Sequence, residues 1–263
     1  RLAGPGTLVR AETLEYLGMA YTLRAECAQA LRYYEEALET RRAAKDAAGI
    51  AKDLNQLGNL RHRMGQYAEA VICYRQALEG MRALAEDPVL GDSRVVAGTA
   101  NNLASTLLRL GELAEARSLF EECLERFRTL QDGRRAADVL ANLGLLAQAE
   151  GRLEEAEGFY GESLQCKREL GDPLGESNVL TNIAYLAIAR GRHEDALAHA
   201  ARSAALLQQH GIDGTLAPAL VCRGLALLEL DRIGDAAAAA DEADAVARKV
   251  HADDQRAEVE ALR

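Results

Sequence analysis

Four side-chain amides recur at regular intervals along the chain, and an amide is a group that can bind another polypeptide. Gln56, Asn102, Asn142 and Asn182 are separated by 46, 40 and 40 residues. Each amide can donate and accept hydrogen bonds at once, so it can pair with the main chain of an extended peptide whatever that peptide's sequence. Because Asn is a poor helix former, its return inside helix-like stretches is unusual. If successive segments of the chain stack, these amides form a ladder.

The amides belong to a repeat that covers most of the chain. Two residues after each amide stands a small residue, and an alanine follows twelve positions later. The small residues are Gly18, Gly58, Ala104, Gly144, Ala184 and Gly224, and the alanines are Ala30, Ala70, Ala116, Ala156, Ala196 and Ala236. In the first and last copies the amide position holds Tyr16 and Cys222. A period of this length marks a solenoid built from one supersecondary unit.

Each copy reads as two helices with no strand signal. In the fourth copy, one face of a first helix carries Leu140, Leu143, Gly144 and Ala147. A break at 151–153 follows, and the buried side of a second helix carries Ala156, Tyr160, Ser163 and Leu164. The next first helix is expected to begin at Asp172 and Pro173, as N-cap and first helical residue. The pattern predicts antiparallel helices of about 16 to 18 residues.

This pattern resembles the tetratricopeptide repeat. The residues that carry the resemblance in the second copy are Leu54, Leu57, Gly58, Gly65, Tyr67, Ala70, Tyr74 and Ala77. The resemblance implies an all-α, right-handed α-solenoid of six helix-turn-helix repeats plus a partial seventh. The repeats start near residues 11, 51, 97, 137, 177 and 217, and the partial helix spans 253–263. We expect a single domain over 1–263, cut from a longer protein.

The period of 40 residues exceeds the usual 34 of the family. Long-helix arrays of this kind resemble those of kinesin light chain, spindle-orientation adaptors and bacterial signalling and transcriptional regulators. In such arrays the first helices line a concave groove, where asparagines clamp the main chain of a ligand. That role would fall to Asn102, Asn142 and Asn182, and more weakly to Gln56. The alternative is that these amides only bridge neighbouring repeats.

The other expected groove residues change character along the chain. The second and third copies offer polar and mildly basic side chains, among them Lys52, Asn59, Arg63 and Arg109. The fourth and fifth copies offer the apolar Leu145 and Tyr185. A ligand with an acidic feature and an apolar part would suit both sets. As alternatives, the basic residues only offset acids such as Glu112 and Glu115, and the apolar end is buried against further repeats.

Composition and the scattered titratable residues argue against other functions. The net charge of −10 disfavours nucleic-acid and anionic-membrane partners, and no apolar run reaches the ~18 residues of a membrane span. The five cysteines lie far apart, which fits core residues of a cytoplasmic protein. His193 and His199 have the wrong spacing for metal ligands on one helical face. We therefore expect no catalytic site, no metal and no cofactor.

The sequence favours a protein interaction module, the sensor or adaptor part of a larger signalling or regulatory protein. The alternative is a scaffold that forms homo-oligomers through its end repeats. Two irregularities accompany the repeat. The aromatic residue of the second helix is replaced by Ala200 and Ala240 in the last copies, which predicts that these copies are the least stable. The interval of 46 carries extra residues near 84–92, which we expect to form a longer loop or a lip beside the groove.

Overall fold

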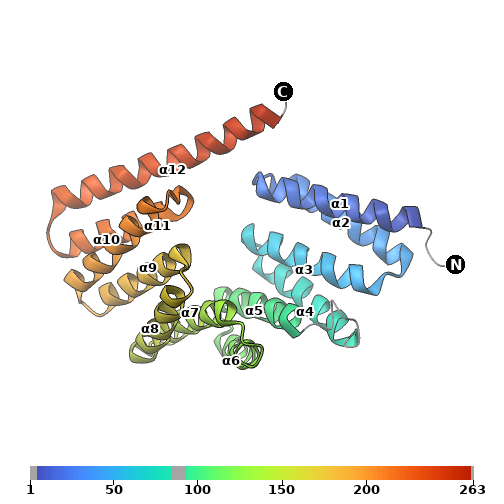
Figure 1. Cartoon of the computed structure of the whole chain (residues 1–263), viewed down its shortest axis with the longest axis horizontal. Coiled ribbons are helices and arrows are strands. Elements are labelled where there is room, and N and C mark those ends of the chain that lie inside the picture. The colour runs from blue at the N-terminus through green and yellow to red at the C-terminus, as the bar shows by residue number, and fades with distance from the viewer. Residues whose placement is uncertain (1–4, 85–92, 262–263) are drawn as a thin grey trace. The chain divides into compact units, whose positions relative to one another are not determined.

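The computed structural model describes residues 5–84 and 93–261, and this part of the chain is helical with no strand (Figure 1). Contacts divide the chain into two compact units, Arg1–Asp132 and Gly133–Arg263, where the sequence predicts one continuous array. Each unit contains three pairs of helices, so the expected all-α repeat architecture with six helix pairs is confirmed.

The six pairs follow one another along the chain. Unit 1 contains α1 (Pro5–Leu23), α2 (Cys27–Ala44), α3 (Ala47–Arg63), α4 (Tyr67–Ala83), α5 (Ser93–Leu110) and α6 (Leu113–Thr129). Unit 2 contains α7 (Gly133–Ala149), α8 (Leu153–Glu169), α9 (Pro173–Ala189), α10 (His193–Gln209), the 3-10 turn η1 (Asp213–Thr215), α11 (Leu216–Glu229) and α12 (Ile233–Ala261). Within each unit, a helix packs mainly on the helices before and after it, as repeat proteins do.

Local capping fixes where the first helices begin. The Asp172 side chain accepts a hydrogen bond of 3.0 Å from the Gly175 backbone N–H, with Pro173 at the first helical position, so this predicted start is confirmed. Asp46 and Gly49 form the same cap on α3 at 3.0 Å. The helices α3, α5, α7 and α9 each begin four residues before the repeat starts predicted from the sequence.

The C-terminal region differs from the expectation of a separate helix over 253–263. The helix α12 runs without interruption from Ile233 to Ala261, so residues 253–261 are its last turns. The physical reason is the absence of a stop signal, since neither Gly nor Pro occurs after Gly234. Residues 85–92, where a long loop or lip was expected, lie outside the described residues.

Each repeat is held together where its two helices cross. The alanines at the second-helix position of the repeat are buried in all six copies. In three copies a tyrosine ring lies directly over the small residue of its own repeat. A Cβ on Gly58 would stand 2.6 Å from the Tyr74 ring, and one on Gly18 would stand 2.8 Å from the Tyr34 ring. Only glycine leaves room for the ring at these crossings.

The junction between the first two repeats is ionic. Arg41, buried at the end of α2, lies 2.7 Å from Glu15 of α1 and 3.0 Å from Asp53 of α3. Neither carboxylate oxygen of Asp53 has a hydrogen-bond partner among the described residues, because the Arg41 pair is not aligned for one. Burial is the main cause that raises the pKa of the Asp53 carboxyl to about 7, against the lowering effect of Arg41.

A similar arrangement recurs in unit 2. The buried Lys167 ammonium lies 3.1 Å from Asp172, the N-cap of α9, and 2.5 Å from Asp138 of α7. Here the carboxylate accepts hydrogen bonds from Lys167 and Gly175, and these hold the pKa of Asp172 below its ordinary value although burial opposes them. Both junctions thus place a buried cation between carboxylates of neighbouring first helices, but the pKa is raised at Asp53, inside α3, and lowered at Asp172, the N-cap of α9.

No described helix has the length and the apolar character of a membrane-spanning segment.

We predict that Gly144→Ala destabilises unit 2 while Gly224→Ala does not. A methyl group on Gly144 would overlap the Tyr160 ring, and such overpacking costs about 1–3 kcal/mol. The nearest atom to a Cβ on Gly224 is the Ala236 carbonyl oxygen at 3.6 Å, so the matched variant fits. Urea denaturation followed by circular dichroism measures both, and equal midpoints for the two variants would contradict the role of the ring.

We predict that the free energy of unfolding decreases as pH rises from about 4 to 7 because of Asp53. Its pKa is raised from 3.8 to about 7 by folding, so the folded state holds this proton more tightly than the unfolded chain. The stabilisation is complete at low pH and is lost as pH rises through 7, with a change on the order of 3–4 kcal/mol, because each pKa unit is worth about 1.4 kcal/mol. Urea denaturation of the wild type and of Asp53→Asn at pH 5 and pH 8 checks this, because the variant lacks the titration. A pH dependence that is the same in both proteins would refute the assignment.

Candidate functional site

The amides of unit 1 form a hydrogen-bonded cluster centred on Asn59. The Asn59 carbonyl oxygen accepts from the Asn102 amide at 3.0 Å and from the Tyr74 hydroxyl at 2.8 Å. The Asn59 amide donates to the Gln56 side-chain oxygen at 3.2 Å. We call Gln56, Asn59 and Asn102 the amide cluster. It connects α3 with α5, so these amides do bridge neighbouring repeats, as the structural alternative expects.

The amide cluster keeps one donor and one acceptor uncommitted. Within the described part of the chain, the Gln56 Nε2 and the Asn102 Oδ1 have no hydrogen-bond partner. Gln56, Asn59 and Asn102 are all half-buried, so they are held in place and still reach solvent. A fixed donor beside a fixed acceptor is the pattern that a peptide main chain requires.

His62 lies on the same face as the amide cluster, one turn further along α3. Its Nδ1 is 2.9 Å from the Thr106 hydroxyl. This hydroxyl donates its only hydrogen to the backbone carbonyl of Asn102 at 2.8 Å. Thr106 must therefore accept from His62, which places the proton of the neutral ring on Nδ1 and leaves Nε2 as an acceptor. Burial, and then the positive charge of Arg109, lower the pKa of His62.

The basic residues predicted for this face have different surroundings. Lys52 lies 2.7 Å from Glu15, so its charge is already offset. Arg63 and Arg109 are exposed, and neither forms an ion pair with a described residue. Glu115, a proposed neutralising acid, instead pairs with Arg75 at 2.8 Å. Arg109 therefore places an uncommitted positive charge near His62, whereas the charge of Arg63 acts on Tyr34 of α2.

The predicted residues of unit 2 lie on α7 and α9 in an apolar setting. Asn142 and Asn182 are half-buried at equivalent positions, and Asn182 makes no hydrogen bond to a described residue. Leu145 is 38% exposed, and Tyr185 is half-buried against a cluster that includes Cys222. Burial raises the pKa of Tyr185 above its ordinary value, so this hydroxyl stays neutral. The fourth and fifth copies thus offer amides beside apolar surface.

At the first and last amide positions the environment changes. Tyr16 is 70% exposed, and Cys222 is fully buried. Neither position therefore offers an amide to a ligand. Sequence reasoning did not identify the central role of Asn59 or the partnership of His62 with Thr106, because both depend on contacts between residues of different helices.

Comparison with known proteins agrees with this repeat geometry. A family model described as tetratricopeptide repeat matches residues 9–83, 95–169 and 135–209, which together make up more than half of the chain. The chain belongs to the tetratricopeptide repeat family. No curated protein matches it.

Several solved tetratricopeptide-like structures share the fold at low sequence identity. BtubC (BKLC) from P. vanneervenii is 20% identical with a TM-score of 0.62, over 87% of this chain and 91% of that chain. NprR in complex with its cognate peptide NprX is 15% identical with a TM-score of 0.71, over 95% and 70%. A Rap protein complexed with competence and sporulation factor is 14% identical with a TM-score of 0.61, over 95% and 78%. At these identities the likeness extends to the fold.

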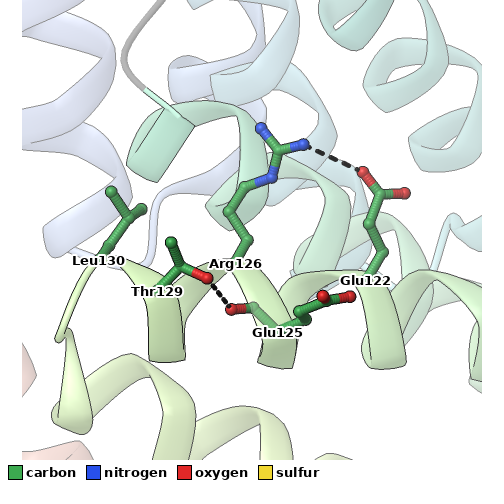
Figure 2. Close-up of a pocket in the computed structure, with 5 residues that line it drawn as sticks. All are labelled: Glu122, Glu125, Arg126, Thr129 and Leu130. Atoms are coloured by element: carbon green, nitrogen blue, oxygen red, sulfur yellow. Dashed lines mark hydrogen bonds and ion pairs between the residues drawn. The ribbon is translucent and has the colours of Figure 1, made fainter.

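This tetratricopeptide-repeat chain also has a pocket along α6, with a volume of about 330 Å³. Figure 2 shows its lining residues, Glu122, Glu125, Arg126, Thr129 and Leu130. The Thr129 hydroxyl donates to the Glu125 backbone carbonyl at 2.9 Å, and Arg126 lies 3.5 Å from Glu122. Its polar groups are thus paired within one helix, which gives no reason to assign a ligand. The described residues contain no group of three His, Cys, Asp or Glu side chains placed to hold a metal ion.

We predict that Asn59→Ala lowers stability and that Asn182→Ala leaves it nearly unchanged. Loss of Asn59 removes the acceptor of the buried Tyr74 hydroxyl and of the Asn102 amide, which costs about 1–3 kcal/mol. Asn182 has no partner to lose. Urea denaturation of both variants measures the difference, and similar losses would show that the amide cluster does not organise this face.

Proposed function

We propose that this chain is a protein interaction module whose first helices bind an extended peptide or protein segment. The observation that carries the proposal is the amide cluster, where Asn59 holds Gln56 and Asn102 so that one amide donor and one carbonyl acceptor remain for a ligand. These two groups would pair with a main-chain carbonyl and a main-chain N–H of the ligand. Such pairing gives affinity that does not depend on the ligand's sequence.

Selection would come from the charged residues beside the amide cluster. Arg109 is an exposed cation near His62, and Arg63 is an exposed cation at the end of the same helix as the amide cluster, so an acidic side chain or a terminal carboxylate of the ligand would be favoured there. Lys52 would act more weakly, because Glu15 already offsets its charge. The net charge of −10 would repel acidic ligands elsewhere and would make this basic set more selective.

In unit 2, Asn142 and Asn182 would hold main chain while Leu145 and Tyr185 contact an apolar side chain. Exposed apolar surface beside an uncommitted amide supports this assignment. NprR, which shares the fold, forms a complex with its cognate peptide NprX, and this supports peptide binding by analogy of fold. We further propose that the module is a non-enzymatic cytoplasmic sensor or adaptor, part of a larger signalling protein.

We predict that peptides selected on the wild-type chain bind through the amide cluster and the two arginines. Random peptides displayed on phage are panned against the chain, and the Kd of the best synthetic peptide is measured by calorimetry. Gln56→Ala should weaken binding by up to about tenfold through one lost hydrogen bond. Arg63→Ala with Arg109→Ala should weaken it by about tenfold or more and reduce its salt dependence.

The exposed Arg82 of α4 provides a matched control, since Arg82→Ala removes the same charge from a second helix. Its Kd should equal that of the wild type. Failure to select any peptide, or equal binding by all three variants, would contradict the proposed function.

A further inference from the structure

The last pair of helices carries an open apolar groove. The groove has a volume of about 430 Å³ and lies between α11 and α12. Its lining residues are Ala217, Val221, Gly224, Leu225, Leu228, Ala236, Ala240, Ala243, Asp244 and Ala247. Val221, Leu225 and Leu228 are 45%, 41% and 50% exposed, which is high for large aliphatic side chains. We call this surface the tail groove.

In the preceding copy the same face is covered by the next first helix. Ala200, forty residues before Ala240, is fully buried in a cluster with Cys222 of α11. Leu207, forty residues before Ala247, is fully buried in a cluster with Leu216 and Ala219 of α11. The tail groove therefore corresponds to the face of α10 that α11 covers, but no described helix covers it on α12.

The first helix, α1, also has a side that no described helix covers. Leu17, one residue before the small residue Gly18, is 38% exposed. Leu57, Leu103 and Leu143 occupy the same position in later copies and are 2%, 3% and 1% exposed. Leu57 lies in one cluster with Leu38 of the preceding repeat, and no described helix takes that place beside α1.

The two surfaces are complementary in volume. Where α10 meets α11, Ala200 lies in one cluster with Cys222, which occupies the amide position of its repeat. The residues at the corresponding places on the two open surfaces are Ala240 in the tail groove and Tyr16 on α1. Tyr16 is 70% exposed, and Ala240 leaves room where earlier copies carry an aromatic ring. A large side chain on one surface thus faces a small one on the other.

The two surfaces are also complementary in charge. Ala204 of α10 shares a cluster with Leu216 of α11. The corresponding residues on the open surfaces are Asp244 and Arg10. They now form exposed ion pairs with Arg248 at 2.6 Å and with Glu36 at 2.5 Å, which contribute little and can be exchanged. The apolar pair Ala204 and Leu216 inside the chain thus corresponds to a pair of opposite charges on the two open surfaces.

We propose that the chain self-associates head to tail, with α1 of one copy packed in the tail groove of another copy in the register of the internal repeats. The interface is heterologous, because each copy contributes two different surfaces, so it produces open filaments or closed rings rather than symmetric dimers. Tyr16 fills the space beside Ala240, and Arg10 pairs with Asp244. The inference is independent of the proposed peptide site, which uses the first helices of the middle copies.

Charge reversal tests the register directly. The mass of the wild type is measured by light scattering over a range of concentrations, together with Arg10→Glu and Asp244→Arg. Each variant places like charges against each other in its own interface, so each should remain monomeric at concentrations where the wild type associates. An equimolar mixture should associate again, because each head then meets a tail of opposite charge. Both residues are exposed, and circular dichroism confirms that the variants stay folded.

A second variant checks the volume argument. Tyr16→Ala should weaken self-association, and Arg32→Glu on the exposed surface of α2 serves as the control that should not. Association of the mixture but of neither charge variant alone would establish the head-to-tail register. A wild type that stays monomeric at the highest soluble concentration would overturn the proposal and leave the tail groove to another occupant. Association that neither charge variant changes would also overturn it, because a different surface would then be responsible.

Discussion

The contact between a glycine and a tyrosine ring, where the two helices of a repeat cross, determines most of what surrounds it. Gly58 lets the Tyr74 ring lie against α3, and the ring brings its hydroxyl within 2.8 Å of Asn59. The same Asn59 oxygen accepts from the Asn102 amide, and the Asn59 nitrogen donates to Gln56, so Asn59 orients both side chains. A packing constraint in the core thus fixes the polar groups of the amide cluster, which we propose bind a ligand. Binding groups supported in this way lose little freedom when a ligand binds, which favours affinity.

The same crossing explains why the two units differ. In the fourth copy Tyr160 lies over Gly144, but its hydroxyl donates to Gln148 at 3.3 Å. The residue that corresponds to Asn59 is Leu145, which has no polar atom to offer. The tyrosine of unit 2 therefore stabilises the crossing without organising an amide cluster. The change from polar to apolar surface between the second and fourth copies follows from this one position.

The sequence predicts the architecture better than the site, for a physical reason. The period, the crossing residues and the Asp172 cap are local features, and each dictates the backbone within a few residues of itself. The length of α12 was not predicted, because the repeat period indicated a new helix at 253. The absence of Gly and Pro after Gly234 lets α12 continue to Ala261. The amide positions were found from their register, whereas the pairing of Lys52 with Glu15 required knowledge of which helices meet. Side chains of other helices decide whether a charge or an amide is still available, and periodicity does not reveal them.

Size and charge at the repeat interfaces also restrict which surfaces can stack. The second helices of the first four copies carry an aromatic ring at the position of Ala240, such as the fully buried Tyr160 of α8, and such a ring leaves less room for a further tyrosine than alanine does. Tyr16 is therefore compatible with a partner surface that carries alanine, and Ala240 provides one in the tail groove. The pair Arg10 and Asp244 adds an electrostatic penalty for any register that brings like charges together. Repeats that share one fold but differ at these few positions can therefore form different contacts. One set of contacts joins neighbouring repeats inside the chain, and the other, in the proposed assembly, joins α1 to the tail groove of another copy.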